Sequence, residues 1–291
     1  MYERIMVPLD GSTTAEMALP YAIEIATYFN SEIVLFSVIE IGGTHTESLF
    51  HSYLGVISTR IREDVKPKRS GNAAVRIQIV AGNPASEILH HADSDGIDLI
   101  IMTSRGSSVD SIWALGNIAT KIVRIAAKPV MVVKTRAKGS ESGRKTLVSR
   151  ILVPLDGSRV GEAAVPHAEE MARKLQAELV LFHAVEPAAG WPTARDSIVR
   201  ARDENEVKAA RVYLDDVARA LTKKGLPVSS RLVTGYPAEE IVNYAETHDI
   251  DLITISTHGR SGVGRWAIGS VTDKLLYAGN IPILVEHAKS Q

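Results

Sequence analysis

The 291-residue sequence contains no cysteine. Disulfide bonds, thiolate metal ligands and cysteine nucleophiles are therefore excluded, and the composition fits a reducing compartment. No run approaches 18 consecutive apolar residues, and near the N-terminus only the short stretch from Ile5 to Leu9 precedes Asp10. We therefore expect neither a membrane span nor a signal peptide, and a cytoplasmic location.

Neither sign of charge dominates the chain. The 33 Lys and Arg residues are balanced by 34 Asp and Glu residues, which gives a net charge of -1 and an isoelectric point of about 6.8. A chain without a strong positive field holds nucleic acid poorly, so we expect no nucleic-acid partner and no membrane partner. The 45% hydrophobic and 23% charged content is that of an ordinary globular protein.

The chain contains an internal repeat. Arg4–Glu40 aligns without a gap on Arg150–Glu186, at an offset of 146 residues and with 19 identities in 37 positions. The match resumes at an offset of 153, where Gly82–Ile88 aligns on Gly235–Ile241. A repeat of this length indicates that one domain has been duplicated.

Three segments follow from this repeat. We predict a first domain at residues 1–136, a linker at 137–148 and a second domain at 149–291. The linker is rich in Lys, Arg, Gly and Ser and poor in apolar residues, which is typical of a solvated connection.

Each copy alternates short apolar, β-branched runs with longer helical patterns, which is typical of a parallel sheet covered by crossover helices. Strands are expected at residues 4–9, 32–39, 75–81, 97–103 and 129–134, and at 150–155, 178–185, 228–234, 250–256 and 282–286. The predicted fold class is α/β, with two repeated, open, five-stranded, doubly wound parallel-sheet domains of the Rossmann-like kind. Ligands of such folds bind at the carboxyl ends of the strands, where the strand order reverses.

A glycine-containing loop follows the fourth strand of the second copy. It reads Ser256, two residues, Gly259, nine residues, Gly269 and Ser270. Gly259 lets the backbone approach a ligand, and Gly269 permits a tight entry into the next helix. Because a helix N-terminus carries roughly half a positive charge, the loop is predicted to bind phosphate.

With these motifs the chain resembles a tandem universal stress protein, two domains of that family in one polypeptide. The nucleotide motif of the family is Gly, two residues, Gly, nine residues, Gly and then Ser or Thr, and here Ser256 replaces the first glycine. The resemblance implies an adenine-nucleotide alpha hydrolase-like fold, a stress-response role and ATP, with or without Mg²⁺, as the ligand. In the second domain it implies a site made of Pro154, Asp156, Ala184, Ser256, His258, Gly259, Gly269, Ser270, Val271 and Thr272, of which the first three frame the ribose and adenine.

The first copy departs further from the motif. Asn117 and Ala119 stand where the second copy has Ser270 and Thr272, so two hydroxyl groups are lost. We therefore expect the nucleotide mainly in the second domain. The weaker site of the first domain consists of Pro8, Asp10, Val38, Thr103, Gly106, Gly116 and Asn117.

Simpler explanations stay open for these residues. The glycines of the loops can serve only to turn the chain, and Asp10 and Asp156 can equally cap the helices that follow them. The sequence contains no phosphate-binding Gly-x-x-x-x-Gly-Lys motif, no Gly-x-Ser-x-Gly and no His-Glu-x-x-His. We therefore expect no catalytic residue, no metal site and slow or no ATP hydrolysis.

The sequence leaves three functions open. The first is a regulatory, nucleotide-binding stress protein, the second a ligand-free interaction module of the same fold, and the third a weak ATPase. The fifth strands, 129–133 and 282–285, come last in their sheets. The resemblance implies pairing through that edge, since single-domain members of the family commonly dimerise there. We expect the two domains to pair through these edge strands within the chain, and whole chains to form homo-oligomers.

Overall fold

The computed structural model describes residues 1–39, 44–65, 74–106, 115–134, 146–187, 197–259 and 268–287, the side chains of 44–46 and 197–203 excepted. These residues form two compact units. The first contains Met1–Leu147 together with Pro282–His287, and the second contains Val148–Ile281. Most of the expected linker lies outside the described residues, so its boundaries stay a prediction.

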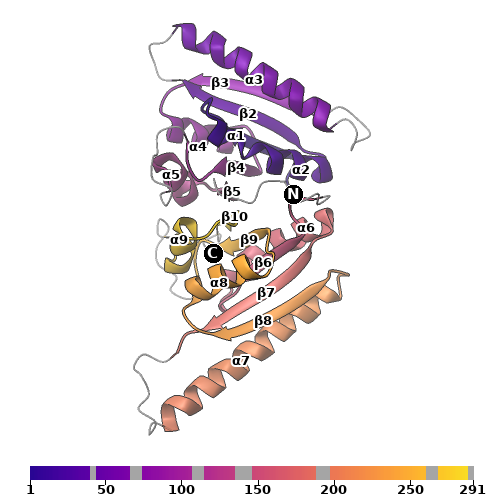
Figure 1. Ribbon diagram of the computed structural model, residues 1–291, viewed down its shortest axis with the longest axis vertical. Helices are drawn as coiled ribbons and strands as arrows, with labels where there is room; N and C mark the ends of the chain where they lie inside the picture. Colours follow the sequence, from indigo (N-terminus) through magenta and orange to yellow (C-terminus); the bar gives the residue numbers. More distant parts are fainter. Residues whose placement is uncertain are drawn as a thin grey trace. The chain divides into compact units, whose positions relative to one another are not determined.

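The first unit is a parallel sheet covered by helices (Figure 1). Its elements from residue 1 to 134 are β1 (Arg4–Pro8), α1 (Thr13–Glu16), α2 (Leu19–Phe29), β2 (Glu32–Ile39), α3 (Thr44–Val65), β3 (Val75–Ala81), α4 (Pro84–Ser94), β4 (Leu99–Thr103), α5 (Asn117–Ile125) and β5 (Val130–Val133). The strand order is β3-β2-β1-β4-β5, with every one of these pairs parallel. The order reverses between β1 and β4, because the chain crosses from one edge of the sheet to the middle through α4.

The second repeat has the same succession of elements. They are β6 (Arg150–Pro154), the 3₁₀-helix η2 (Gly161–Ala164), α6 (Val165–Leu175), β7 (Glu178–Val185), α7 (Ser197–Thr222), β8 (Val228–Thr234), α8 (Pro237–Thr247), β9 (Leu252–Ser256), α9 (Ser270–Tyr277) and β10 (Ile283–Glu286). In the second unit the strand order is β8-β7-β6-β9, again parallel, and it reverses between β6 and β9.

The predicted fold class and the ten predicted strands are confirmed, with shifts of one or two residues at some ends. The strands are strongly predicted because they are apolar on both faces: Ile33, Val34, Leu35 and Phe36 of β2 are fully buried. The two copies do not align between the second and third strands, so the repeat predicts no secondary structure for these segments. In the structure, the long helices α3 and α7 occupy them and pack on β3 and β8.

The last strand of the chain belongs to the first compact unit. β10 pairs with β5 in antiparallel fashion, with Ile283 opposite Val132 and Leu284 opposite Met131. All four residues are buried. The expected pairing between the two fifth strands is therefore present.

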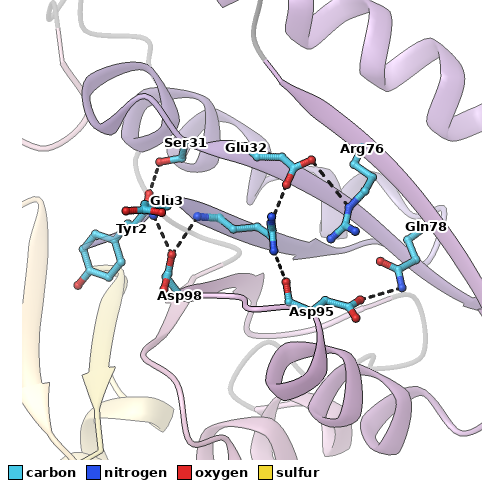
Figure 2. Close-up of polar contacts among 9 residues, drawn as sticks. Tyr2, Glu3, Ser31, Glu32, Arg76, Gln78, Asp95 and Asp98 are labelled. Carbon is cyan, nitrogen blue, oxygen red and sulfur yellow. Dashed lines mark hydrogen bonds and ion pairs between the residues drawn. The ribbon is translucent and has the colours of Figure 1, made fainter.

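A polar network joins the amino ends of β1, β2 and β4 (Figure 2). Asp98 Oδ2 accepts the backbone N–H groups of Glu3 at 2.8 Å and Arg4 at 3.1 Å, and Arg4 Nε lies 2.6 Å from Glu32 Oε2. Gln78 Nε2 donates to Asp95 Oδ2 from the neighbouring strand β3. These contacts fix the end of the sheet that lies opposite the expected ligand edge.

The second unit repeats this network. Asp251 Oδ2 accepts the backbone N–H groups of Ser149 and Arg150, and Arg150 Nε lies 3.0 Å from Glu178 Oε2. Two copies of one ion-pair arrangement indicate a structural role, because both define where the strands start.

Within the described residues no helix has the length and hydropathy needed to cross a membrane.

Candidate functional site

The candidate site of each unit lies where the strand order reverses, at the carboxyl ends of the two central strands. In the first unit these are β1 and β4, and in the second β6 and β9. Crevices of doubly wound sheets open at this point because the loops on its two sides lead to helices on opposite faces. Pro154 ends β6, and Ser256 ends β9.

The Asp-Gly-Ser turn after the first strand has the same geometry in both units. Asp156 Oδ1 accepts the backbone N–H of Ser158 at 3.0 Å and its hydroxyl at 2.7 Å. The Ser158 hydroxyl oxygen in turn accepts the N–H of Gly161 at 3.0 Å. In the first unit, Asp10 Oδ1 accepts from Ser12 in the same way.

These bonds correct the interpretation of the aspartates as caps. The side chain that caps α1 belongs to Ser12, which accepts the N–H of Ala15 at 3.1 Å. Asp10 instead orients the capping Ser12, and Asp156 orients Ser158, whose hydroxyl oxygen accepts the N–H of Gly161. A carboxylate that receives two hydrogen bonds on one oxygen is held in a fixed direction.

The second carboxylate oxygen lies against the first glycine of the loop. A Cβ built on Gly259 would lie closer than 3.0 Å to Asp156 Oδ2, and one built on Gly106 would lie closer than 3.0 Å to Asp10 Oδ2. Real Cβ atoms do not approach an oxygen this closely. These glycines therefore make room for the carboxylate, a requirement that the loop spacing alone did not reveal.

The second glycine of the loop begins the last helix of each repeat. The N–H of Gly269 donates to the Thr257 carbonyl at 2.7 Å, and the N–H of Gly116 donates to the Ser104 carbonyl at 2.8 Å. Neither α9 nor α5 receives a side-chain cap at its first turn. Both helices thus present backbone N–H groups at the carboxyl edge of the sheet, and Ser270 is exposed there.

Thr272 differs from Ser270 in its surroundings. Its side chain is buried, and its hydroxyl donates to the Ser256 carbonyl at 2.8 Å. The hydroxyl therefore ties α9 to the end of β9. At the matching position of the first copy, Ala119 is also buried and makes no such bond.

His258 lies directly before Gly259. Its Nδ1 is 2.9 Å from the Thr257 hydroxyl oxygen, and its backbone N–H is 3.5 Å from Ser256 Oγ. The Nε2 atom is buried, with no hydrogen-bond partner among the described residues. This nitrogen is therefore free to contact a group bound beside the loop.

The residues expected to frame the base lie on adjacent strand ends. Ala184 is half-buried on β7 and pairs with Val233, while Val38 is half-buried on β2 and pairs with Val80. Pro8 pairs with Phe36 at the end of β1. The structure thus brings the expected residues of each repeat to one edge of its sheet.

Sequence reasoning missed three side chains at this edge in the first unit. Lys134 follows β5, and burial lowers its pKa to about 8. Phe50 and Tyr53 lie on α3, in a segment where the repeat is not detectable. The apolar spacing of this segment was the signal that could have placed it on a helix.

No group of three or more His, Cys, Asp or Glu side chains with suitable geometry for a metal occurs in the described parts of the chain.

Comparison with known proteins decides the family. The profile of the Universal stress protein family matches residues 1–134 and again 148–287. This chain belongs to the universal stress protein family. Its two matches make it a tandem member, as the internal repeat predicted.

Individual relatives match one half or nearly the whole of the chain. Universal stress protein MJ0531 of Methanocaldococcus jannaschii is 30% identical over 144 residues, which are 48% of this chain and 83% of the relative. Universal stress protein Slr1230 of Synechocystis is 23% identical over 310 residues, 97% of this chain and 99% of the relative. A universal stress protein from Archaeoglobus fulgidus has a TM-score of 0.68 at 18% identity, covering 99% of this chain and 97% of that one, which shows a shared fold.

Proposed function

We propose that this universal stress protein is a stress-response regulator that binds ATP at the carboxyl ends of its strands, mainly in the second unit. Family membership supports the stress role. The ligand proposal rests on the site itself.

One observation carries the ligand proposal: α9 starts at the switch point without a side-chain cap. Ser270, Val271 and Thr272 form the first turn of α9, so their backbone N–H groups have no acceptor within the helix. The helix dipole adds partial positive charge at this end. Gly269 brings this turn close to the end of β9 through its bond to Thr257. Phosphate oxygens match this arrangement in charge and hydrogen-bonding capacity.

The second unit is favoured because of one exposed side chain. Ser270 can donate a hydroxyl hydrogen bond to a phosphate, whereas the exposed Asn117 offers a bulkier amide at that position. The buried pair Thr272 and Ala119 does not distinguish the sites directly, because the Thr272 hydroxyl already bonds to Ser256. ATP binding at the second unit then depends on Ser270 and the backbone.

Hydrolysis is expected to be slow or absent. A general base must reach the attacking water with a carboxylate or imidazole that is free to accept its proton. Asp156 Oδ1 is bound to Ser158, and its Oδ2 lies against Gly259, so this carboxylate is held in a positioning role. The bound nucleotide would then act as a stable signal.

Native mass spectrometry of the intact chain tests the proposal. After nucleotide is removed and ATP with Mg²⁺ is added, we expect one added ATP mass per chain and little phosphate release over hours. A ligand-free interaction module would retain its unmodified mass at millimolar ATP. Rapid phosphate release that Asp156→Asn abolishes would favour an ATPase instead.

A further inference from the structure

The two candidate sites differ on the side formed by the long helix after the second strand. In the first unit α3 brings Phe50 onto the Asp-Gly-Ser turn. Its ring atoms Cε1 and Cζ lie 3.8 Å from the position of a Cβ on Gly11, which is ordinary van der Waals contact. Asp10 beside it is exposed. An aromatic ring and an accessible carboxylate thus adjoin at the ligand edge.

Tyr53 holds this part of α3 in place. Its hydroxyl donates to Glu16 Oε1 at 3.1 Å, which links α3 to α1. The rings of Phe50 and Tyr53 meet edge to face, with centroids 6.2 Å apart and planes 88° apart. Burial raises the pKa of the Tyr53 hydroxyl, and the negative charges of Glu16 and Asp10 raise it further.

At the matching positions the sequence of the second repeat has no aromatic residue. When β3 is aligned on β8, the buried residues Ile57 and Ile61 of α3 match the buried Ala210 and Leu214 of α7. At the same offset, Phe50 and Tyr53 correspond to Asp203 and Glu206. Phe50 and Tyr53 are therefore particular to the first repeat.

We propose that Phe50, supported by Tyr53, is the base-binding wall of the first site, and that this site recognises the ring and sugar of a nucleoside rather than its phosphates. The inference rests on the proposed nucleotide-binding function and names a different ligand class for the first unit. A planar base gains stacking energy from an aromatic ring, and ribose hydroxyls can donate to the exposed Asp10 carboxylate.

The acidic groups on the α3 side of this site agree with a ligand that carries few phosphates. Asp10 and Glu16 are acidic groups near the ring, and they disfavour a polyphosphate on this side. At the loop, Asn117 replaces the exposed serine of the second copy. Adenosine and adenosine monophosphate should therefore bind the first site more tightly than ATP does, while the second site should require the phosphates.

Calorimetric titration of the full chain with adenosine tests this inference. We expect one adenosine per chain, about tenfold weaker in Phe50→Ala and unchanged in Ser270→Val. Val56→Ala, at an exposed position on α3, is the matched control and should bind as the wild type does. Loss of one base-stacking contact typically costs a factor of this order.

The variant Phe50→Trp distinguishes a loss of adenosine binding from a loss of packing around Phe50. It retains an aromatic wall, so we expect adenosine binding to persist and the added tryptophan fluorescence to change with saturation. If the wild type binds ATP at the second site but no adenosine, or if Phe50→Ala binds adenosine like the wild type, the inference is wrong and the proposed function stands. If the wild type binds neither adenosine nor ATP, the proposed function fails as well.

Discussion

Asp156 and Gly259 occupy adjoining space at the switch point of the second unit, because the carboxylate oxygen Oδ2 lies where it would clash with a Cβ on the glycine. The carboxylate has little freedom to move away, because its other oxygen is bonded to Ser158. The contact links the turn after β6 to the loop after β9.

Gly259→Ala should therefore destabilise the second unit by about 1–3 kcal/mol, the usual cost of overpacking. Asp156→Ala should remove most of this penalty, so that the double variant is more stable than the sum of the single changes predicts. Urea denaturation of all four proteins measures this coupling. Gly55→Ala is the control, because a Cβ there meets nothing within 4 Å. Additive effects of Gly259→Ala and Asp156→Ala would contradict the contact.

The Thr272 hydroxyl should contribute to stability more than to ligand binding. Thr272→Val leaves the buried Ser256 carbonyl without its donor, and we expect a loss of about 1 kcal/mol in the free energy of unfolding. Thr272→Ser retains the hydroxyl and should preserve most of the bond. Calorimetry of the two variants should give similar ATP affinities. A large loss of ATP affinity confined to Thr272→Val would show that the hydroxyl contacts the ligand.

Leu284 should stabilise the first unit although it is encoded at the end of the second repeat. It is fully buried and pairs with Met131. Leu284→Ala should cost about 2–5 kcal/mol and speed hydrogen exchange in β5. Val212→Ala, at an exposed position of α7, should leave that exchange unchanged. Unchanged protection of Val130–Val133 in Leu284→Ala would show that β10 does not stabilise this strand.

Asp95 should make the first unit sensitive to acid. Burial alone would raise its pKa, but hydrogen bonds from Gln78, His91 and Ser94 outweigh burial, so the pKa is lowered overall. A lowered folded-state pKa stabilises the fold above about pH 4, and this stabilisation is lost as the pH falls through the folded-state pKa.

The melting temperature of Asp95→Asn should accordingly lie below that of the wild type at pH 6, and the gap should narrow below about pH 4. Asp93→Asn, at an exposed position in the last turn of α4, directly before the C-cap region that holds Asp95, is the matched control and should follow the wild-type profile. A gap that stays constant from pH 6 to pH 3 would refute the assignment.

The fold was largely predictable because its information is local and repeated. Doubly buried strands such as β2 and β7 are apolar along their length, and the duplication showed each one twice. The pairing of β5 with β10 was also predictable, since unpaired edges of apolar strands must be covered.

The candidate site was predictable only as a set of positions. The positions of Asp156 and Gly259 in the sequence, each just after a predicted strand, placed both at the carboxyl edge of the sheet. Their contact depends on the tertiary structure, which no local sequence pattern encodes. The same holds for Thr272, whose hydroxyl bonds across 16 residues to Ser256. Phe50 could not be identified at all, because the repeat gives no matching aromatic residue at its position in the second copy.

Titration calorimetry of nucleotide-free protein with ATP and Mg²⁺ tests the central claim most directly. We predict one tight ATP site per chain that is lost in Ser270→Val and nearly unchanged in Asn117→Val, with about 2.7 kcal/mol of added stability at a hundredfold excess over Kd. Absence of any ATP binding at millimolar concentration, or equal losses in the two variants, would contradict the account.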